Sequence, residues 1–364
     1  MKSILKISSA FIGAVLGAGF ASGQEIMQYF TSFGQIGILG AIAVAILFGI
    51  TGMLLVSIGY KLKAISHMEV IRQISGRYLG MGYDIVIIFV LFGIGLVMLA
   101  GAGPIFSQQF EIPTYMGTIL MSVLVLITIM TGVKKVIQVL AVVTPVFLLV
   151  IVFVNIYSLI TSDNSTAEME SIALQQASVT NNWFTAAFNY LSVVTLTNAA
   201  MLFIMGGSET NGKHAAAGGF LGGLLCGVLV LVSNMAIFQN IDVVASLQMP
   251  TLGLATQISP LLGLIFSVAL FGMIYGTGVS MFFSFSSRFF EPKTKGFNIF
   301  SIITIIVASS LSLYGFSELI SIVFPIVGYL GYIFLVILVV GAFRLRSKAK
   351  TEEIPERENL KAVK

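Results

Sequence analysis

The chain has 364 residues, of which 57% are hydrophobic and only 9% are charged. An ordinary soluble domain has about 25% charged residues, so this composition is that of an integral membrane protein. The net charge of +4 does not indicate nucleic-acid binding, because the basic residues lie in loops and tails between apolar runs. The single cysteine and two histidines exclude a disulfide framework and supply neither a metal cluster nor a catalytic triad.

Apolar runs of about 20 residues predict membrane-spanning helices. Ten such runs are present, at 5–31, 36–60, 82–107, 114–132, 136–161, 182–207, 215–238, 259–287, 298–315 and 317–343. With the N-terminus inside, all 19 Lys and Arg residues fall in inner segments or tails. The positive-inside rule therefore predicts a multi-pass protein with both termini in the cytoplasm.

The outer segments carry only acidic charges. These are Glu111, Asp163, Glu168, Glu170 and Asp242. The longest outer segment is expected to hold a short surface helix over 167–176, and a second sizeable loop starts at Gln248. The charged end after residue 343 is expected to be solvated and partly disordered. A secretory signal peptide is the alternative for the N-terminus, but the apolar pattern continues past Glu25.

The stretch from Phe11 to Gln28 begins as a membrane helix and then changes character. Its four glycines, Gly13, Gly17, Gly19 and Gly23, are followed at once by Gln24 and Glu25. A glycine costs roughly 1 kcal/mol in a helix interior, and a carboxylate at membrane depth indicates a functional site. We predict that the helix is broken here, with Gly17 to Gly19 unwound, and that the break is a binding site. The alternative is that the glycines only permit close helix packing, which leaves Gln24 and Glu25 unexplained.

A broken membrane helix exposes backbone groups that bind ions. Free N–H groups suit a carboxylate, and free C=O groups suit Na⁺. A substrate can lie against the backbone of Gly17, Ala18 and Gly19, which carry no side chain beyond a methyl group. Glu25, with Gln24 beside it, is a candidate for coupling or gating, as a proton carrier, a cation ligand or a partner to a hydroxyl. The alternative for Glu25 is an outer-interface residue that faces water.

Ten helices with both ends inside divide into two inverted sets of five, as in many secondary transporters. We expect a first repeat at 1–161, an outer loop at 162–181, a second repeat at 182–343 and a cytoplasmic tail at 344–364. The pattern predicts a second break in the sixth helix, which holds a polar run. That run comprises Asn189, Tyr190, Ser192, Thr195, Thr197 and Asn198, and the first four are candidate substrate-binding residues.

The eighth helix carries a polar patch from Tyr275 to Ser280 within an apolar run. Thr277 and Ser280 lie one turn apart, so both hydroxyls can face the same neighbour. Together with carbonyls of the first helix they form a candidate Na⁺ site, and Tyr275 is a candidate substrate-binding residue. The alternative is that each hydroxyl bonds back to the carbonyl four residues earlier.

The segment from Gly13 to Glu25, which includes Gly17, Gly19-Phe20 and Gly23-Gln24, closely resembles the start of the YkvI-like bacterial membrane proteins. It is also similar to the first helix of permeases in the amino acid–polyamine–organocation superfamily, which share the LeuT fold. The resemblance implies a 5+5 inverted repeat, with helices 1, 2, 6 and 7 as a bundle and the others as a scaffold. It implies that the backbone of Gly17 to Gly19 receives a substrate carboxylate, with Phe20 as a further candidate substrate-binding residue. It also implies Na⁺ near Gly13, Leu16, Thr277 and Ser280. Many sodium-coupled members have two adjacent hydroxyl residues in helix 8, whereas here they are three apart.

These features predict an all-α secondary transporter in a bacterial cytoplasmic membrane. Its substrate is expected to be a small organic solute, an amino acid or related zwitterion, coupled to Na⁺ or H⁺. The expected partners are that solute and the lipid bilayer, with no nucleic acid and with no cofactor besides a Na⁺ ion. A nutrient-sensing receptor on the same scaffold is the alternative. An enzyme is not expected, because no acid, base or nucleophile constellation accompanies Glu25.

Overall fold

The computed structural model describes residues 2–15, 17–131 and 134–362, which form helices and loops without any strand. The helices are α1 (Lys2–Val15), α2 (Ala18–Ser22), α3 (Gln24–Tyr29), the 3₁₀ turn η1 (Thr31–Phe33), α4 (Gln35–Lys61), α5 (His67–Ser75), α6 (Arg77–Phe110), α7 (Thr114–Thr131), α8 (Lys134–Thr161), α9 (Thr166–Ala173), α10 (Trp183–Gly207), α11 (Gly212–Gln239), α12 (Ile241–Val244), α13 (Pro250–Ile258), α14 (Pro260–Ser286), α15 (Lys295–Ser312) and α16 (Phe316–Ala362). The predicted all-α class is confirmed.

Within the described residues, nine helices are long and apolar enough to cross a membrane: α4, α6, α7, α8, α10, α11, α14, α15 and α16. The 27 residues of α4 span about 40 Å, compared with a hydrocarbon core of about 30 Å. The second to tenth predicted spans each coincide with one of these helices. The first, 5–31, is divided among α1, α2 and α3. The count of ten spans and their orientation stay predictions.

The outer segments and the charged end differ in detail from the prediction. The surface helix expected over 167–176 is present as α9, and the loop after Gln248 folds into α13. The charged end was expected to be partly disordered, yet α16 continues to Ala362. Its Lys, Arg, Glu and Ala residues are good helix formers, so the helix extends beyond the apolar span.

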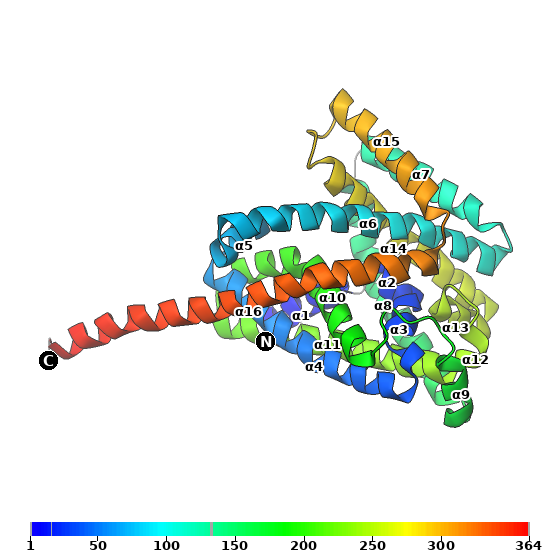
Figure 1. Ribbon diagram of the computed structural model, residues 1–364, viewed down its shortest axis with the longest axis horizontal. Coiled ribbons are helices and arrows are strands. Elements are labelled where there is room, and N and C mark those ends of the chain that lie inside the picture. The colour runs from blue at the N-terminus through cyan, green and yellow to red at the C-terminus, as the bar shows by residue number, and fades with distance from the viewer. Residues whose placement is uncertain (1, 16, 132–133, 363–364) are drawn as a thin grey trace.

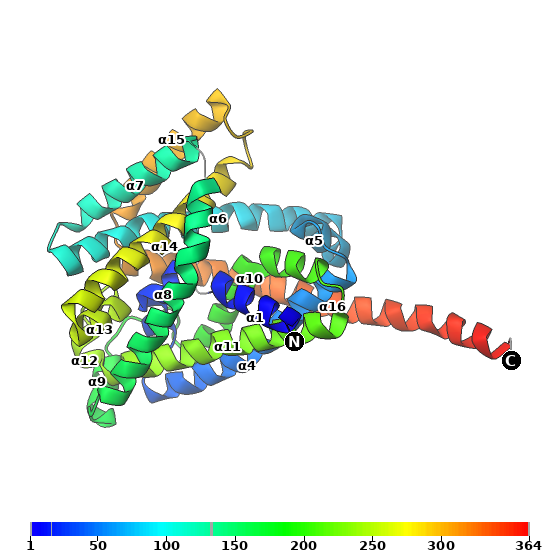
Figure 2. The same cartoon turned by 180° about the vertical axis from the view of Figure 1, so that it is seen from behind.

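The helices pack as two groups. In one group α4 lies against α10 and α11, and α1 lies against α11; in the other, α6, α7, α14 and α15 contact one another. α8 and α16 each contact both groups. Figure 1 shows α7 and α15 set apart from the first group, with the N-terminus and the projecting end of α16 at the same end of the molecule. Figure 2 shows α9, α12 and α13 together at the opposite end.

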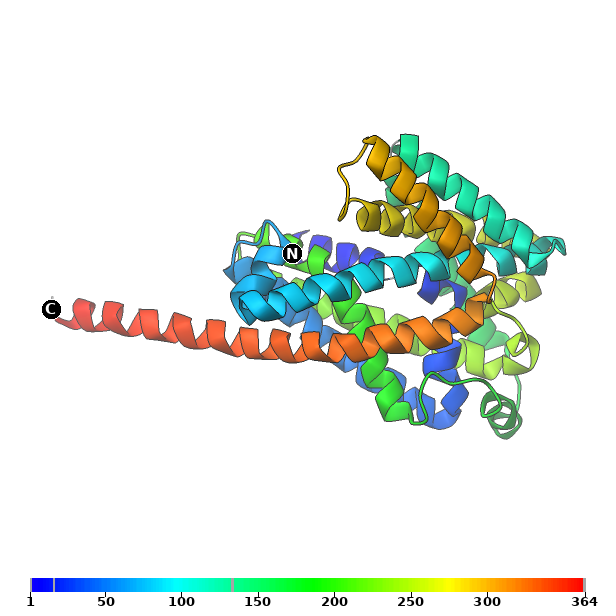
Figure 3. The same ribbon diagram turned by 45° about the horizontal axis from the view of Figure 1, so that its top comes forward.

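Glycines allow the closest of these helix contacts. A Cβ at Gly52 of α4 would overlap with the carbonyl oxygen of Gly219 in α11, and a Cβ at Gly219 would overlap with that of Gly52. Small residues at such crossings let two backbones approach, which is how helices associate in a lipid environment. α11 of this tight pair contacts both α1 and α3. Figure 3 shows the chain from another angle, with the end of α16 projecting beyond the other helices.

Candidate functional site

The first helix is broken where the glycine cluster predicts it, although the break is placed differently in detail. α1 ends at Val15, and Gly17 is extended, with φ −74° and ψ −179°. Gly17 is therefore unwound, but Ala18 and Gly19 already belong to α2, so the prediction of an unwound Gly17–Gly19 segment is wrong for its last two residues. The reason is that the Ala21 N–H donates to Gly17 O at 3.1 Å, which starts a new helical turn.

A second turn, which the sequence did not predict, separates α2 from α3. Gly23 has φ +81°, in the left-handed region that favours glycine. A Cβ at Gly23 would also overlap with the Thr251 hydroxyl of α13. The chain between Val15 and Tyr29 therefore bends twice. A glycine lies at each bend, and the backbone at the second bend favours glycine.

The double bend brings Glu25 back onto α2. Its side chain is buried, with 6% exposure, and a Cβ at Gly19 would overlap with Glu25 Oε1. The carboxylate thus lies against the glycine of the preceding helix. The alternative of an outer-interface residue facing water is therefore wrong. Within the described part of the chain, Glu25 makes no hydrogen bond or ion pair.

The end of the broken helix is tied to three other helices. Gln28 Nε2 donates to Ser317 O of α16 at 2.9 Å. The Tyr29 hydroxyl donates to Asn189 Oδ1 of α10 at 2.8 Å. The Thr31 hydroxyl donates to an asparagine of α11, Asn234, at 2.8 Å. These buried bonds hold α3 and η1 in place. Sequence reasoning missed Asn234, although an asparagine in an otherwise apolar span was a signal that could have found it.

An aromatic cluster packs beside α3. The ring of Tyr190 lies 5.1 Å from that of Tyr29, 5.2 Å from that of Phe30 and 6.0 Å from that of Phe48. Both tyrosines are almost fully buried, and Tyr29 follows Glu25 by one turn on α3. The structure therefore gathers Tyr190, a predicted site residue, with the broken helix.

The predicted break in the sixth helix is wrong, because α10 is continuous from Trp183 to Gly207. No glycine or proline occurs before Gly206 to interrupt it. Its polar side chains are satisfied locally: Ser192 bonds to Phe188 O at 2.9 Å, Thr197 to Val193 O at 2.8 Å and Asn198 to Val194 O at 2.9 Å. A polar run of this kind fits an intact helix.

The other candidates on α10 lie in the protein interior. Asn189 is held between Tyr29 and Pro325 O, to which its Nδ2 donates at 3.0 Å. Thr195 is buried, with 3% exposure, and Phe20 of α2 has the same exposure. Asn189 thus joins α3, α10 and α16, whereas the role of Thr195 and Phe20 in binding stays a prediction.

The polar patch of α14 divides between two faces. Tyr275 turns away from the break, since its hydroxyl hydrogen-bonds to Thr128 of α7. Thr277 and Ser280 are half-buried and make no hydrogen bond within the described residues, so neither bonds back to its own helix. Helical spacing places both on the face of Met273. Met273 lines a cavity of about 300 Å³ with Ile12 and Gly13 of α1 and residues of α8. Leu16 lies outside the described residues.

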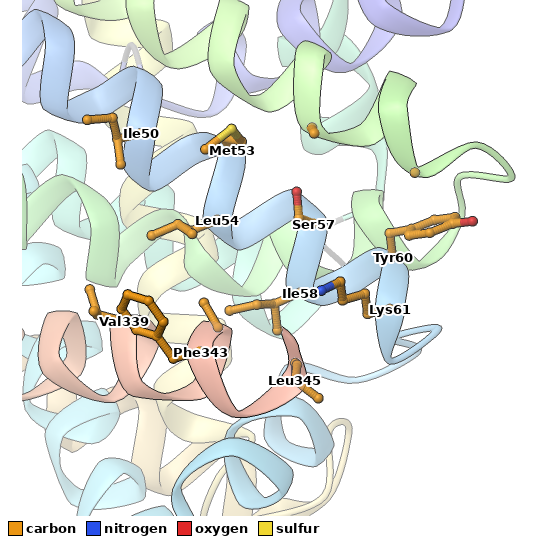
Figure 4. Close-up of a pocket in the computed structure, with 13 residues that line it drawn as sticks. Ile50, Met53, Leu54, Ser57, Ile58, Tyr60, Lys61, Val339, Phe343 and Leu345 are labelled. Carbon is orange, nitrogen blue, oxygen red and sulfur yellow. The ribbon is translucent and has the colours of Figure 1, made fainter. Parts of the chain in front are cut away.

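A larger cavity lies elsewhere. It is a groove of about 640 Å³ between α4, α11 and α16. Figure 4 shows Ile50, Met53 and Leu54 of α4 on one side, with Val339 and Phe343 of α16 opposite. Its lining is almost wholly apolar and partly exposed, as expected of a membrane-facing groove between helices. None of the predicted site residues lines it.

The sequence resembles two proteins of Bacillus subtilis (strain 168). It is 27% identical to YyaD over 327 residues, which make up 90% of this chain and 93% of YyaD. It is 25% identical to the membrane protein YkvI over 336 residues, which make up 92% of this chain and 94% of YkvI. The resemblance to the YkvI-like membrane proteins is confirmed. No protein-family model matches the sequence.

Solved structures show the fold of this chain. The structure of MhsT in complex with L-phenylalanine matches with a TM-score of 0.62 and 16% identity, covering 90% of this chain and 86% of MhsT. The inward-facing conformation of Mhp1 matches with a TM-score of 0.65 and 14% identity, covering 93% of this chain and 75% of Mhp1. The chain therefore has the LeuT-type fold that the resemblance implied.

Proposed function

We propose that the protein is a secondary transporter that moves a small organic solute across a bacterial cytoplasmic membrane by alternating access. The observation that carries this proposal is the break at Gly17, with the buried Glu25 folded against it. Discontinuous helices of this kind form substrate and ion sites near the midplane of transporters. An amino acid or related zwitterion is the proposed substrate, and the complex of the similar MhsT with L-phenylalanine supports this class.

A 5+5 inverted repeat is part of the proposal, with α1–α3 as the first of ten spans. The packing supports it, because contacts recur when each helix is exchanged for its counterpart five spans later. α1 packs on α11 as α10 packs on α4, and α8 packs on α14 as α16 packs on α6. The distribution of Lys and Arg supports a cytoplasmic location for both termini.

Alternating access requires the bundle to rock against the scaffold. The bond from Gln28 of α3 to Ser317 of α16 joins these two parts, so we expect it to break when the site opens on that side. The cavity beside Gly13 and Met273 lies on the other side of the break. This arrangement fits a transporter whose site is closed on the side of α3 and lies nearer to open space on the side of Gly13.

The coupling ion is proposed to be Na⁺ or H⁺. The unbonded hydroxyls of Thr277 and Ser280, on the same helix face as Met273 near Gly13, support a Na⁺ site. The two hydroxyl residues are three positions apart, so this site would differ from one built on two adjacent hydroxyl residues in helix 8. Glu25 is the carboxylate that supports proton coupling.

The proposal is tested with the full chain purified in detergent and reconstituted in proteoliposomes. A thermal-shift screen of the proteinogenic amino acids, with and without Na⁺, identifies the solute, and counterflow of the labelled solute follows. We expect millimolar or tighter binding and exchange across the membrane. Binding without exchange would contradict transport and favour a nutrient-sensing receptor; no binding at millimolar concentration would refute the substrate class.

A further inference from the structure

Acceptor groups without donors gather on α3. Gln24 Oε1 and Gln28 Oε1 are buried and have no hydrogen-bond partner, and Glu25 makes no bond within the described residues. Exposure of the three side chains is 4%, 6% and 3% in chain order. At 3.6 residues per turn, the three positions share about a third of the helix circumference. Gln28 Nε2 is already bonded to α16, so the oxygens of these three side chains are acceptors that no donor reaches within the described residues.

An ionised Glu25 also requires a positively charged partner, whereas a protonated Glu25 does not. A buried carboxylate without a counter-charge is strongly unfavourable. Apart from Lys6, at the inner end of the first predicted span, the basic side chains of the sequence lie outside the predicted spans. The single ion pair within the described residues, between Arg288 and Asp84, involves partly exposed side chains elsewhere. Within the part of the chain that the structure describes, no basic side chain pairs with Glu25.

The surroundings of Glu25 favour an organic ammonium group. An ammonium has three N–H donors and accepts none, so it can donate to the Glu25 carboxylate and to the unpaired carbonyl oxygens of Gln24 and Gln28. Tyr29 follows Glu25 by one turn on α3, its ring lies 5.1 Å from that of Tyr190, and aromatic faces attract organic cations. Conversely, a substrate carboxylate at Gly19 would be placed beside the carboxylate of Glu25 and would be repelled.

We propose that α3 binds the ammonium group of the transported solute, with Glu25 as its counter-charge and Gln24 and Gln28 as further acceptors. The inference rests on the proposed function and narrows its substrate class. The solute is a primary amine, amino acids included, and it is recognised through its ammonium group. Its carboxylate, where present, is not required.

The test compares matched ligands that differ in one charged group. L-Phenylalanine is compared with phenethylamine, which lacks the carboxylate, and with hydrocinnamate, which lacks the ammonium; leucine, isoamylamine and isocaproate form a second set. Affinities are measured on the full chain by isothermal titration calorimetry, with and without Na⁺. We expect the amines to bind within about tenfold of their amino acids, and the acids to bind at least about tenfold more weakly than the amines.

Two variants and a control assign the effect to Glu25. Glu25→Gln should weaken amine binding by about 10- to 100-fold, whereas Glu25→Asp, which keeps the charge, should weaken it less. Glu168→Gln makes the same change on an exposed part of α9 and should have no effect. Thermal unfolding confirms that each variant is folded.

The possible outcomes separate this inference from the proposed function. Binding of amino acids and acids without binding of amines, or unchanged amine affinity in Glu25→Gln, overturns the ammonium site and leaves transport standing. Loss of only the Na⁺ dependence in Glu25→Gln also overturns it, because Glu25 would then hold the inorganic ion. If no compound of either set and no amino acid binds, the proposed function fails, and the inference fails with it.

Discussion

Gly19→Ala is the substitution that most sharply separates binding from folding in this protein. The new Cβ would overlap with Glu25 Oε1 and lie close to Glu25 Cδ. The obstacle is the end of a flexible side chain, so the carboxylate can move aside while the backbone stays in place. Because Glu25 is the proposed counter-charge of the solute, its displacement should weaken binding.

The expected effect on stability is small because two contributions offset each other. Moving Glu25 to a less favourable rotamer costs about 0.5–1.5 kcal/mol. Replacing glycine by alanine within a helix contributes about 0.5–1 kcal/mol in the opposite direction. The net change in the free energy of unfolding should therefore stay within about 1 kcal/mol. Loss of a hydrogen bond to a charged group costs about 1.5–3 kcal/mol, so affinity for an amine should fall about 10- to 100-fold.

The assay pairs calorimetric titration of an amine with thermal unfolding of the same preparation. Gly272→Ala serves as the matched control, since a Cβ at Gly272 of α14 has no neighbouring atom within 4 Å. It should leave affinity unchanged and raise the free energy of unfolding by about 0.5–1 kcal/mol. Unaltered amine affinity in folded Gly19→Ala would refute the reasoning, because the position of the carboxylate against α2 would then have no part in binding.

Further substitutions test the structure around the break. Gly23→Ala should lower the free energy of unfolding by about 2–4 kcal/mol, because the left-handed backbone disfavours a Cβ and the new Cβ also overlaps with α13. A loss below about 1 kcal/mol in denaturant unfolding would contradict the second bend. Thr31→Val should cost about 1–3 kcal/mol by leaving Asn234 without its partner, and strict additivity with Asn234→Leu in a double-mutant cycle would disprove their bond. Arg288→Met should change stability by less than about 1 kcal/mol, since its pair with Asp84 is partly exposed; a larger drop in melting measurements at low salt would show a stronger role.

Apolar runs were sufficient to predict where the long helices lie. The glycine cluster also predicted a break near Gly17, because glycine weakens a helix wherever it occurs. The exact form of the break was not predictable, since only the structure reveals that Gly23 adopts a left-handed conformation. The approach of Glu25 to Gly19 depends on that turn. In one continuous helix, residues six positions apart lie on different faces.

The polar run in α10 led to the wrong prediction of a break, because composition does not reveal which groups the polar side chains bond to. Ser192 and Thr197 bond within their own helix, so a break was not needed to satisfy them. In contrast, the bond of Asn189 to Tyr29 joins residues 160 positions apart. Such pairings are set by tertiary packing, which a single sequence does not display.

A structure of the full chain, determined by electron cryo-microscopy with a bound amine, tests the central claim most directly. The ligand used is one that binds in the titration and exchanges in counterflow. The account predicts density for its ammonium group at Glu25, between α2 and α3 and beside the ring of Tyr190. A ligand bound in the apolar groove of α4, α11 and α16, or anywhere else with no contact to α3, would contradict it.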